Sequence, residues 1–150
     1  MFTTYLNLFT PDSKYYLKTW IDKRSGKVQT SISFVTMQLP CFNIFREIFY
    51  LDGIKIVPLD IYNNLTAVGL AYWIMDDGSK SEQGLHLNTY GFDHQSIDRL
   101  LFVLRGKFDL ECTIHTHPRG QRLFIPSTSM PRLRELVSPY IIPSMQYKIK

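Results

Sequence analysis

Two adjacent carboxylates follow directly on an apolar segment in the middle of the sequence. Residues 70 to 75 are apolar or aromatic, Asp76 and Asp77 come next, and Gly78 closes the run. If residues 65 to 77 form a helix, both carboxylates lie at its C-terminus, where the helix dipole disfavours negative charge by up to about 1 kcal/mol. A divalent cation offsets this penalty, and two such helix ends side by side form a centre for two-metal phosphodiester hydrolysis. The alternative is an Asp-Asp-Gly turn that only ends the helix.

Small residues in the same predicted helix favour close contact with a second helix. Ala67 and Ala71 are four positions apart, with Gly69 between them. Residues four apart lie on one face of a helix, so this face is low and a second backbone can approach it closely. Such a contact would bring the two carboxylate ends together.

The composition is that of a folded domain with a modest positive charge. The 150 residues are 45% hydrophobic and 14% aromatic, and 17 Lys and Arg face 13 Asp and Glu. A positive excess suits a polyanionic partner, although many ordinary basic proteins share it. Cys41 and Cys112 form no CxxC pattern, which argues against a disulfide framework or zinc site and favours a reducing compartment. No apolar run approaches the roughly 18 residues that span a bilayer, so a soluble protein without a membrane partner is expected.

Elements with alternating or helical periodicity surround the acidic pair. A strand is predicted over residues 27 to 37, another over 15 to 21, and a basic turn over 22 to 26 between them. A short helix is predicted over residues 42 to 50. After the acidic pair come a strand over 86 to 90, a helix capped by Asp93 and closed by Gly106, a hairpin around 118 to 120, and a last helix capped by Ser129. This order predicts an α+β fold.

Polar and basic residues on the predicted strands and turns have the types that bind nucleic acid. Asn, Gln and Arg pair with base edges, and Lys and Arg contact phosphates. The alternative is an ordinary half-exposed polar sheet face. His115 and His117 point the same way on one strand, but no third metal ligand accompanies them. The predicted nucleic-acid-binding residues are Lys14, Lys18, Lys23, Arg24, Lys27, Gln29, Ser31, Ser33, Lys80, His86, Asn88, His115, His117, Arg119, Gln121 and Arg122.

Four segments together resemble a known family. LTAVGLAYWIMDDGSK resembles the second LAGLIDADG motif of the two-motif homing endonucleases encoded in mitochondrial introns. IKIVPLDIYNNLT resembles the linker before that motif, GLHLNTYGF the first strands after it, and SPYIIPSMQYKIK the closing helix and its tail. The similarity extends over roughly residues 27 to 150. It implies a LAGLIDADG homing-endonuclease-like fold with antiparallel, saddle-shaped sheets that read DNA in the major groove.

The resemblance also implies roles for three residues. Asp77 matches the metal-binding aspartate of the family and is assigned as the catalytic metal ligand, with Mg²⁺ as the cofactor. Lys148 matches a lysine that polarises the reaction, and Lys55 resembles its counterpart in the other half. Asp76 matches a position without a catalytic role. For both lysines, simple exposure on the surface is the alternative.

The first motif of the two-motif family has no counterpart here. Nothing between residues 1 and 55 resembles a motif helix that ends in Asp-Gly or Asp-Ala. We therefore expect a single domain with a partial first repeat at about 1 to 60 and a complete second repeat at about 65 to 150. Without a partner helix, Leu70, Trp73 and Ile74 are expected to face water. A second chain or copy, or a ribonucleoprotein surface, is expected to cover them.

Two functions follow from these expectations. The first is Mg²⁺-dependent DNA cleavage at a long site of the intron-insertion type, once a second motif completes the centre. The second is a cleavage-dead protein that binds structured RNA, either an intron maturase or a component of a ribonucleoprotein particle such as a mitochondrial ribosome. The resemblance implies a mitochondrial location for both.

Overall fold

The computed structural model describes residues 15–33, 35 and 37–150. The chain forms two compact units, residues 1–45 and 46–150. The predicted division into two repeats near residues 60 to 65 stays a prediction. None of the described helices is long and apolar enough to cross a membrane. Cys41 is exposed, and the buried Cys112 is likewise unpaired.

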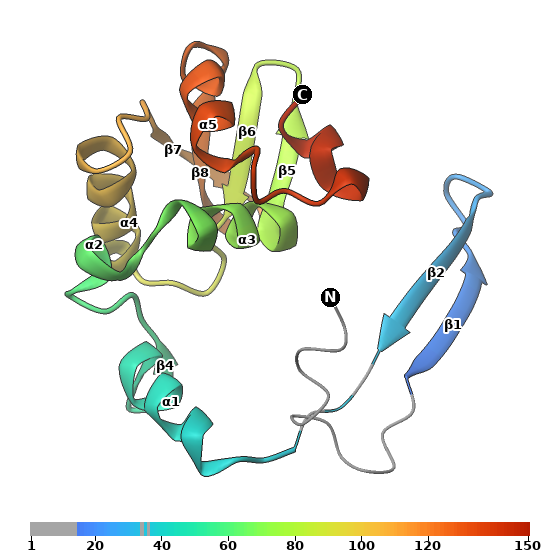
Figure 1. Cartoon of the computed structure of the whole chain (residues 1–150), viewed down its shortest axis with the longest axis horizontal. Coiled ribbons are helices and arrows are strands. Elements are labelled where there is room, and N and C mark those ends of the chain that lie inside the picture. The colour runs from blue at the N-terminus through green and yellow to red at the C-terminus, as the bar shows by residue number, and fades with distance from the viewer. Residues whose placement is uncertain (1–14, 34, 36) are drawn as a thin grey trace. The chain divides into compact units, whose positions relative to one another are not determined.

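The first unit contains a two-stranded antiparallel sheet, shown in blue in Figure 1. Its strands are β1 (Tyr16–Ile21), close to the predicted range, and β2 (Val28–Ser33), which ends before the predicted limit at residue 37. The turn between them forms because Asp22 Oδ1 accepts hydrogen bonds from the backbone N–H groups of Arg24 and Ser25, at 2.8 and 3.0 Å. These contacts lower the pKa of Asp22. A 3-10 turn, η2 (Pro40–Phe42), then leads into α1 (Asn43–Phe49), which confirms the predicted helix.

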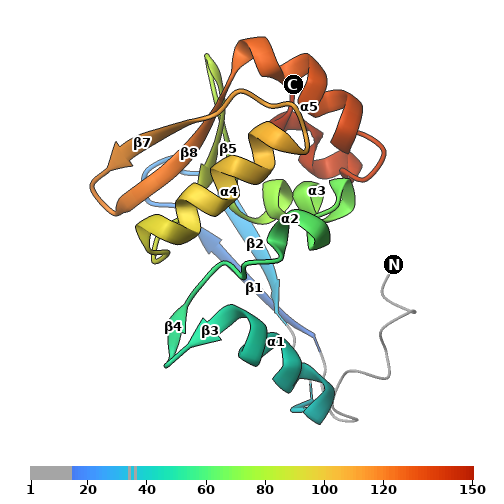
Figure 2. The ribbon, with the colours of Figure 1, turned by 90° about the vertical axis from the view of Figure 1, so that its left-hand side faces the viewer.

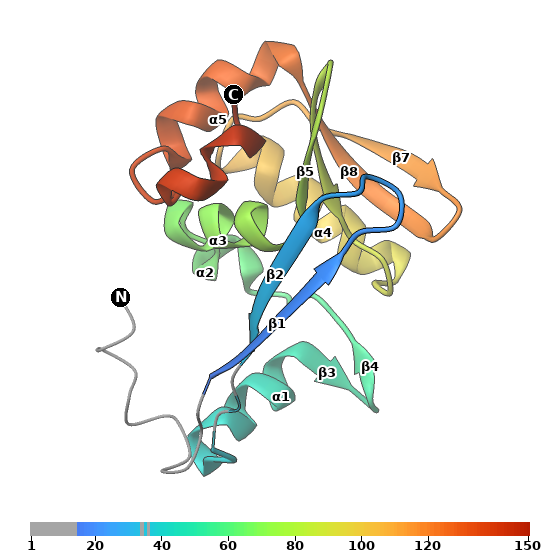
Figure 3. The same ribbon diagram turned by 90° about the vertical axis from the view of Figure 1, so that its right-hand side faces the viewer.

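The second unit is built on a four-stranded antiparallel sheet in the order β5-β6-β8-β7. Figures 2 and 3 show α3, α4 and α5 along one face of this sheet. The strands are β5 (Gly78–Ser81), β6 (Gly84–Asn88), β7 (Thr113–His117) and β8 (Gly120–Pro126). The three helices are α3 (Ala67–Asp77), α4 (His94–Gly106) and α5 (Met130–Val137). Shorter elements are β3 (Tyr50–Leu51), β4 (Ile54–Lys55), α2 (Ile61–Asn64), η3 (Ser127–Ser129) and η4 (Pro143–Lys148).

The hydrophobic core lies between the four-stranded sheet and these helices. Because side chains alternate along a strand, one face of β6 and β8 carries apolar residues. Leu85, Leu87, Leu123 and Ile125 on that face are all 0% exposed. The α+β fold and the antiparallel sheets agree with the prediction.

Several boundaries differ from the sequence predictions. Strand β5 starts directly after α3, where only a turn had been expected, and β6 begins at Gly84 rather than at His86. Asp93 caps α4 as predicted, its Oδ1 accepting from Ser96 N at 2.8 Å. Gly106 does not close that helix but belongs to it, and the left-handed residue beyond the helix is Asp109, with φ of 56°.

Ser129 marks the start of α5 but does not cap it through its side chain. Its hydroxyl instead accepts a hydrogen bond from the backbone N–H of Glu111, at 2.9 Å. Ser129 is buried, and this hydrogen bond joins the start of α5 to the segment before β7. The predicted start of α5 at Ser129 is therefore correct, but the Ser129 hydroxyl bonds to Glu111 and does not cap the helix.

Helix α3 buries more of its apolar surface than the sequence predicted. Leu70 and Ile74 are 0% exposed and Trp73 is partly buried, so the expectation that these residues face water is wrong. Ala71 is also fully buried, which leaves Val68 and Tyr72 as the exposed apolar residues of the helix. The sheet, α5 and the C-terminal segment pack against α3. They cover Leu70 and Ile74, which a partner helix was expected to cover.

Candidate functional site

The acidic pair lies where α3 passes into β5. Thr66 caps the start of the helix, and its Oγ1 accepts a hydrogen bond from Gly69 N at 3.2 Å. The helix ends at Asp77, and Gly78 N–H donates to the carbonyl of Ile74. A Cβ at Gly78 would collide with that same carbonyl oxygen. Glycine is therefore required here by close backbone approach, which lets a strand begin immediately after the acids.

A buried lysine closes the C-terminus of α3. Lys148 is 9% exposed, and its Nζ donates to the carbonyls of Met75 at 2.6 Å, Ile74 at 3.3 Å and Asp76 at 3.5 Å. Carbonyls at a helix C-terminus lack partners within the helix and carry partial negative charge. The ammonium donates to the carbonyls of Met75 and Asp76, adds a second donor to that of Ile74, and supplies positive charge beside the acids. This contact explains how the helix tolerates two carboxylates at its unfavourable end.

A second contact holds the backbone of Asp77 against the sheet. Asn88 on β6 donates from Nδ2 to the carbonyl of Asp77 at 2.9 Å. The side chains of Asp76 and Asp77 are both exposed. The part of the chain that the structure describes holds no group of three or more His, Cys, Asp and Glu suited to a metal. One exposed carboxylate still fits Mg²⁺, because Mg²⁺ commonly binds one or two carboxylates together with waters and substrate phosphates.

Of the three predicted catalytic residues, two meet at the end of α3 and one lies elsewhere. Asp77 ends the helix, and Lys148 contacts the carbonyls immediately before it. Lys55 is on β4, with its ammonium 4.5 Å from the centre of the Phe92 ring. The catalytic roles of all three remain predictions.

The outer face of the four-stranded sheet, opposite the core, gathers histidines and an arginine. We define the outer face as His86, Asn88, His115, His117, Arg122 and Phe124. Strand register pairs Asn88 with Arg122 across β6 and β8, and Arg122 with His115 across β8 and β7, so these side chains share one face. His86 Nε2 lies 3.3 Å from His115 Nδ1, and the His115 ring stacks on Phe124 with centroids 4.5 Å apart.

Charge and burial on the outer face favour the neutral form of His86. Burial lowers the pKa of His86 most, and the positive charges of Arg122, His115 and His117 lower it further. Arg122 Nε is buried without a hydrogen-bond partner among the described residues. A buried donor without a partner costs free energy, so the position of this side chain is not explained by contacts within the described residues.

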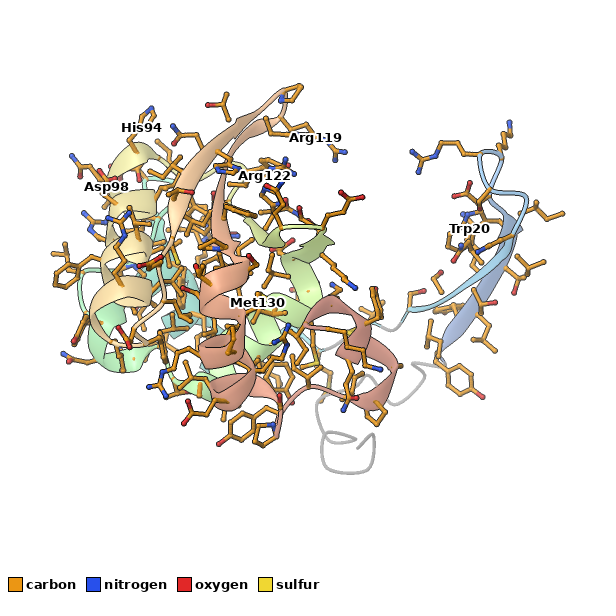
Figure 4. The ribbon with its side chains drawn as sticks, turned by 90° about the horizontal axis from the view of Figure 1, so that it is seen from above. Trp20, His94, Asp98, Arg119, Arg122 and Met130 are labelled. Carbon is orange, nitrogen blue, oxygen red and sulfur yellow. The ribbon has the colours of Figure 1, made fainter. Side chains whose placement is uncertain are left out.

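The tip of the β7–β8 hairpin extends the same surface. Figure 4 labels Arg119 near the end of the hairpin and Arg122 further along β8. The Arg119 guanidinium lies 5.9 Å from the centre of the Tyr90 ring, and the His117 ring lies 5.4 Å from it. Arg and aromatic rings together offer both phosphate contacts and stacking surfaces.

Not all of the predicted nucleic-acid-binding residues join the outer face. Lys80 pairs with Leu85, and Gln121 shares a face with Leu123, so both are on the core-facing side of the sheet. Lys14 lies outside the described residues. The remaining predicted residues are in the first unit, on the turn or on one face of β1 and β2: Lys18, Lys23, Arg24, Lys27, Gln29, Ser31 and Ser33.

Aromatic residues on these faces were missed by sequence reasoning. Phe124 and Tyr90 accompany the outer face, while Tyr16 and Trp20 share the β1–β2 face that carries Lys18. For Tyr16, Trp20 and Phe124 the signal was present, because each alternates along its strand with a predicted polar residue. Aromatic side chains usually lie in the core, so the alternation alone does not assign these rings to a binding surface.

The family is decided by a match over most of the chain. Residues 5–133 match the model of the LAGLIDADG DNA endonuclease family. The chain belongs to this family. The family resemblance inferred from the four segments is therefore confirmed.

Individual LAGLIDADG relatives include both maturases and endonucleases. The chain is 38% identical to cytochrome b mRNA maturase bI2 of Debaryomyces hansenii over 83% of this chain and 48% of that protein. It is 33% identical to the probable intron-encoded DNA endonuclease 3 of Mycosarcoma maydis, over 83% of this chain and 96% of that protein. Three curated relatives are matched over 48%, 33% and 53% of their lengths, so the chain spans at most about half of each.

A solved LAGLIDADG structure has the same fold. The homing endonuclease I-WcaI, bound to its DNA recognition sequence, superposes with a TM-score of 0.78 at 30% identity. The match covers 92% of this chain and 64% of that one. The predicted homing-endonuclease-like fold is therefore confirmed.

Proposed function

We propose that the chain binds nucleic acid through the outer face and the β7–β8 tip. The observation that carries this proposal is the clustering of Arg122 with His86 and His115 on the sheet face left open by the helices. An Arg guanidinium offers donors for guanine edges or phosphates, and a His86 imidazole in its neutral form offers one donor and one acceptor. The similar endonuclease I-WcaI is bound to DNA, which supports the same chemistry here.

The proposed reaction is cleavage of a DNA phosphodiester bond once a second motif completes the centre. Asp77 would hold Mg²⁺, which supplies an activated water and stabilises the leaving oxygen when bound. Lys148 and Asn88 hold the backbone on either side of the Asp77 carboxylate, so they position it. A second chain or a second copy is proposed to supply the other carboxylate.

A binding titration with matched variants tests the interface. Labelled duplex DNA carrying a recognition site of the family is titrated at low and at high salt, with Arg122→Gln beside the charge-matched control Arg46→Gln on α1. We expect binding that weakens steeply with salt, and a loss of about tenfold for Arg122→Gln but little change for the control. Equal affinities for both variants would remove the outer face from the proposal.

A cleavage assay tests the acidic pair. The wild type, Asp77→Asn and Asp76→Asn are compared with Mg²⁺, in a sample that contains any partner chain needed for activity. Cleavage should disappear with Asp77→Asn and persist with Asp76→Asn. Equal cutting by wild type and Asp77→Asn would end the catalytic assignment of Asp77.

The second candidate function is binding of structured RNA without cleavage. It is favoured by the Lys148 ammonium, which is buried on three backbone carbonyls and so is not free to polarise a substrate. A relative named as an mRNA maturase supports the same reading. Competition between a folded intron RNA and duplex DNA decides which ligand is preferred. The mitochondrial location and a ribonucleoprotein partner also stay predictions.

A further inference from the structure

A basic cavity lies beside the β5–β6 turn, away from the outer face. It has a volume of about 570 Å³, and its lining includes the basic side chains of Lys80, Arg134 and Lys150. Serine hydroxyls of Ser81 and Ser127 also line it, and Glu82 is its one acidic side chain. The cavity shares no residue with the outer face. Lys80 is on the core-facing side of β5, whereas His86 is on the outer side of β6.

Backbone and side-chain contacts build the walls of this cavity. Ser127 N donates to the carbonyl of Gln83 at 2.8 Å, which joins the β5–β6 turn to η3. Arg134 on α5 donates from Nε to the carbonyl of Ile149 at 2.7 Å, which holds its guanidinium in place. Its Nη atoms make no hydrogen bond within the described residues, so they remain available for a ligand. Figure 4 labels Met130, an apolar residue of the same wall, on α5.

We propose that this cavity binds phosphate groups. A held guanidinium, two ammonium groups and two hydroxyls match a tetrahedral anion with several acceptor oxygens better than a single carboxylate. In the 150-residue chain, three basic side chains against the Glu82 carboxylate and the α-carboxylate of Lys150 leave the cavity a positive balance. Its volume is in the range of small-ligand sites and admits a phosphate together with a sugar. The phosphates of a nucleic-acid strand and free phosphate compounds share this chemistry.

Isothermal titration calorimetry of the 150-residue chain with inorganic pyrophosphate, at constant ionic strength, tests the proposal. Wild type should bind with a saturable heat. Lys80→Gln should weaken binding about fivefold to tenfold, the loss of one charge-assisted contact. Glu82→Gln should tighten it. Arg46→Gln removes the same charge from exposed α1 and should leave it unchanged.

Further arms identify the source of the phosphate and separate this cavity from the outer face. A single-stranded oligothymidylate that displaces pyrophosphate assigns the site to nucleic-acid strands, and failure to displace assigns it to free phosphate compounds. Arg122→Gln should leave pyrophosphate binding intact even though it weakens duplex binding. Heat without saturation, equal affinity for wild type and Lys80→Gln, or loss of pyrophosphate binding in Arg122→Gln would overturn the proposal. Thermal unfolding of each variant confirms that it is folded.

Discussion

In two antiparallel sheets of this chain, apolar and polar side chains alternate along the strands, but only one of the two apolar faces is buried. The four-stranded sheet carries Leu123 and Ile125 on its inner face, and both are 0% exposed beneath the helices. The two-stranded sheet of the first unit has an equally apolar face, formed by Leu17, Ile21, Val28 and Ile32, and these residues are 55% to 67% exposed. Alternation therefore specifies which side of a strand is apolar, and the elements that follow in the chain decide whether that side becomes core.

The difference has an energetic consequence. Burial of apolar surface contributes roughly 25 cal/mol per Å². The four-stranded sheet receives this contribution, and a two-stranded sheet without a covered face is at best marginally stable in water. Stability should accordingly be concentrated in residues 46–150.

The largest effect is expected from a matched pair of truncations on the two apolar faces. Leu123→Ala should lower the free energy of unfolding by about 3 to 5 kcal/mol, because it leaves a cavity in a closed core. Ile32→Ala should change it by less than about 0.5 kcal/mol, because that side chain is already 55% exposed. Urea denaturation of both variants measures the contrast. A comparable loss for Ile32→Ala would show that another surface covers the β1–β2 face.

The same substitution at two glycines probes how tightly the helix and sheet join. Gly78→Ala should destabilise the protein by about 2 to 3 kcal/mol, because its Cβ would collide with the backbone carbonyl of Ile74. Gly106→Ala should stabilise it by up to about 1 kcal/mol, because Gly106 is helical and its Cβ has ordinary contact with Tyr62. Thermal unfolding of both variants measures whether stability falls for Gly78→Ala and rises for Gly106→Ala. Destabilisation of equal size at both positions would contradict the proposed role of the close approach at Gly78.

Replacing the buried lysine should have an intermediate effect. Lys148→Met keeps most of the apolar stem of the side chain but removes the ammonium from the α3 carbonyls, at a cost of about 1.5 to 2 kcal/mol. Lys150→Met is the control, because Lys150 is exposed. Chemical denaturation compares the two. Wild-type stability for Lys148→Met would mean that water or another group satisfies these carbonyls equally well.

The smallest effect concerns the pH dependence of the outer face. Burial and the nearby Arg122 lower the pKa of His86 from 6.5, so the folded protein holds this proton less tightly than the unfolded chain. The free energy of unfolding is therefore unaffected by protonation of His86 above the pKa of the unfolded state. It declines as the pH falls below 6.5 toward the lower pKa of the folded state. Between about pH 7.5 and about pH 5.5, His86→Gln should lose less stability than wild type. His94→Gln, at an exposed position at the start of α4, should behave as wild type.

Local signals predicted much of the fold. The apolar run before Asp76 predicted α3, the Asp93 cap predicted α4, and the Pro-Arg-Gly turn predicted the β7–β8 hairpin. Each of these signals depends on neighbouring residues in the sequence. Strand β5 was missed because its residues, Gly78–Ser81, are polar or small and become a strand only by pairing with β6.

Long-range contacts explain what the sequence did not predict at the candidate site. Asp77 was found from its place at the helix end, but the contact between Lys148 and Met75 joins residues 73 positions apart. The burial of Leu70 was likewise unpredictable from its helix, because it depends on how α5 and the C-terminal segment pack against α3. The stacking of His115 on Phe124 follows from strand register, which no local pattern specifies.

The contact between Lys148 and α3 also affects the order in which parts of the chain fold. A nascent chain elongated only as far as Tyr147 has already formed every residue of the motif helix, yet the carbonyls of Ile74 and Met75 still lack their cation. Closing so long a loop is entropically costly and slow compared with forming a helix. The acidic end of α3 is therefore expected to become fixed late, after the four-stranded sheet has paired. A chain that ends before this lysine, once released from the ribosome, would pair its four-stranded sheet but leave the acidic end of α3 without its cation.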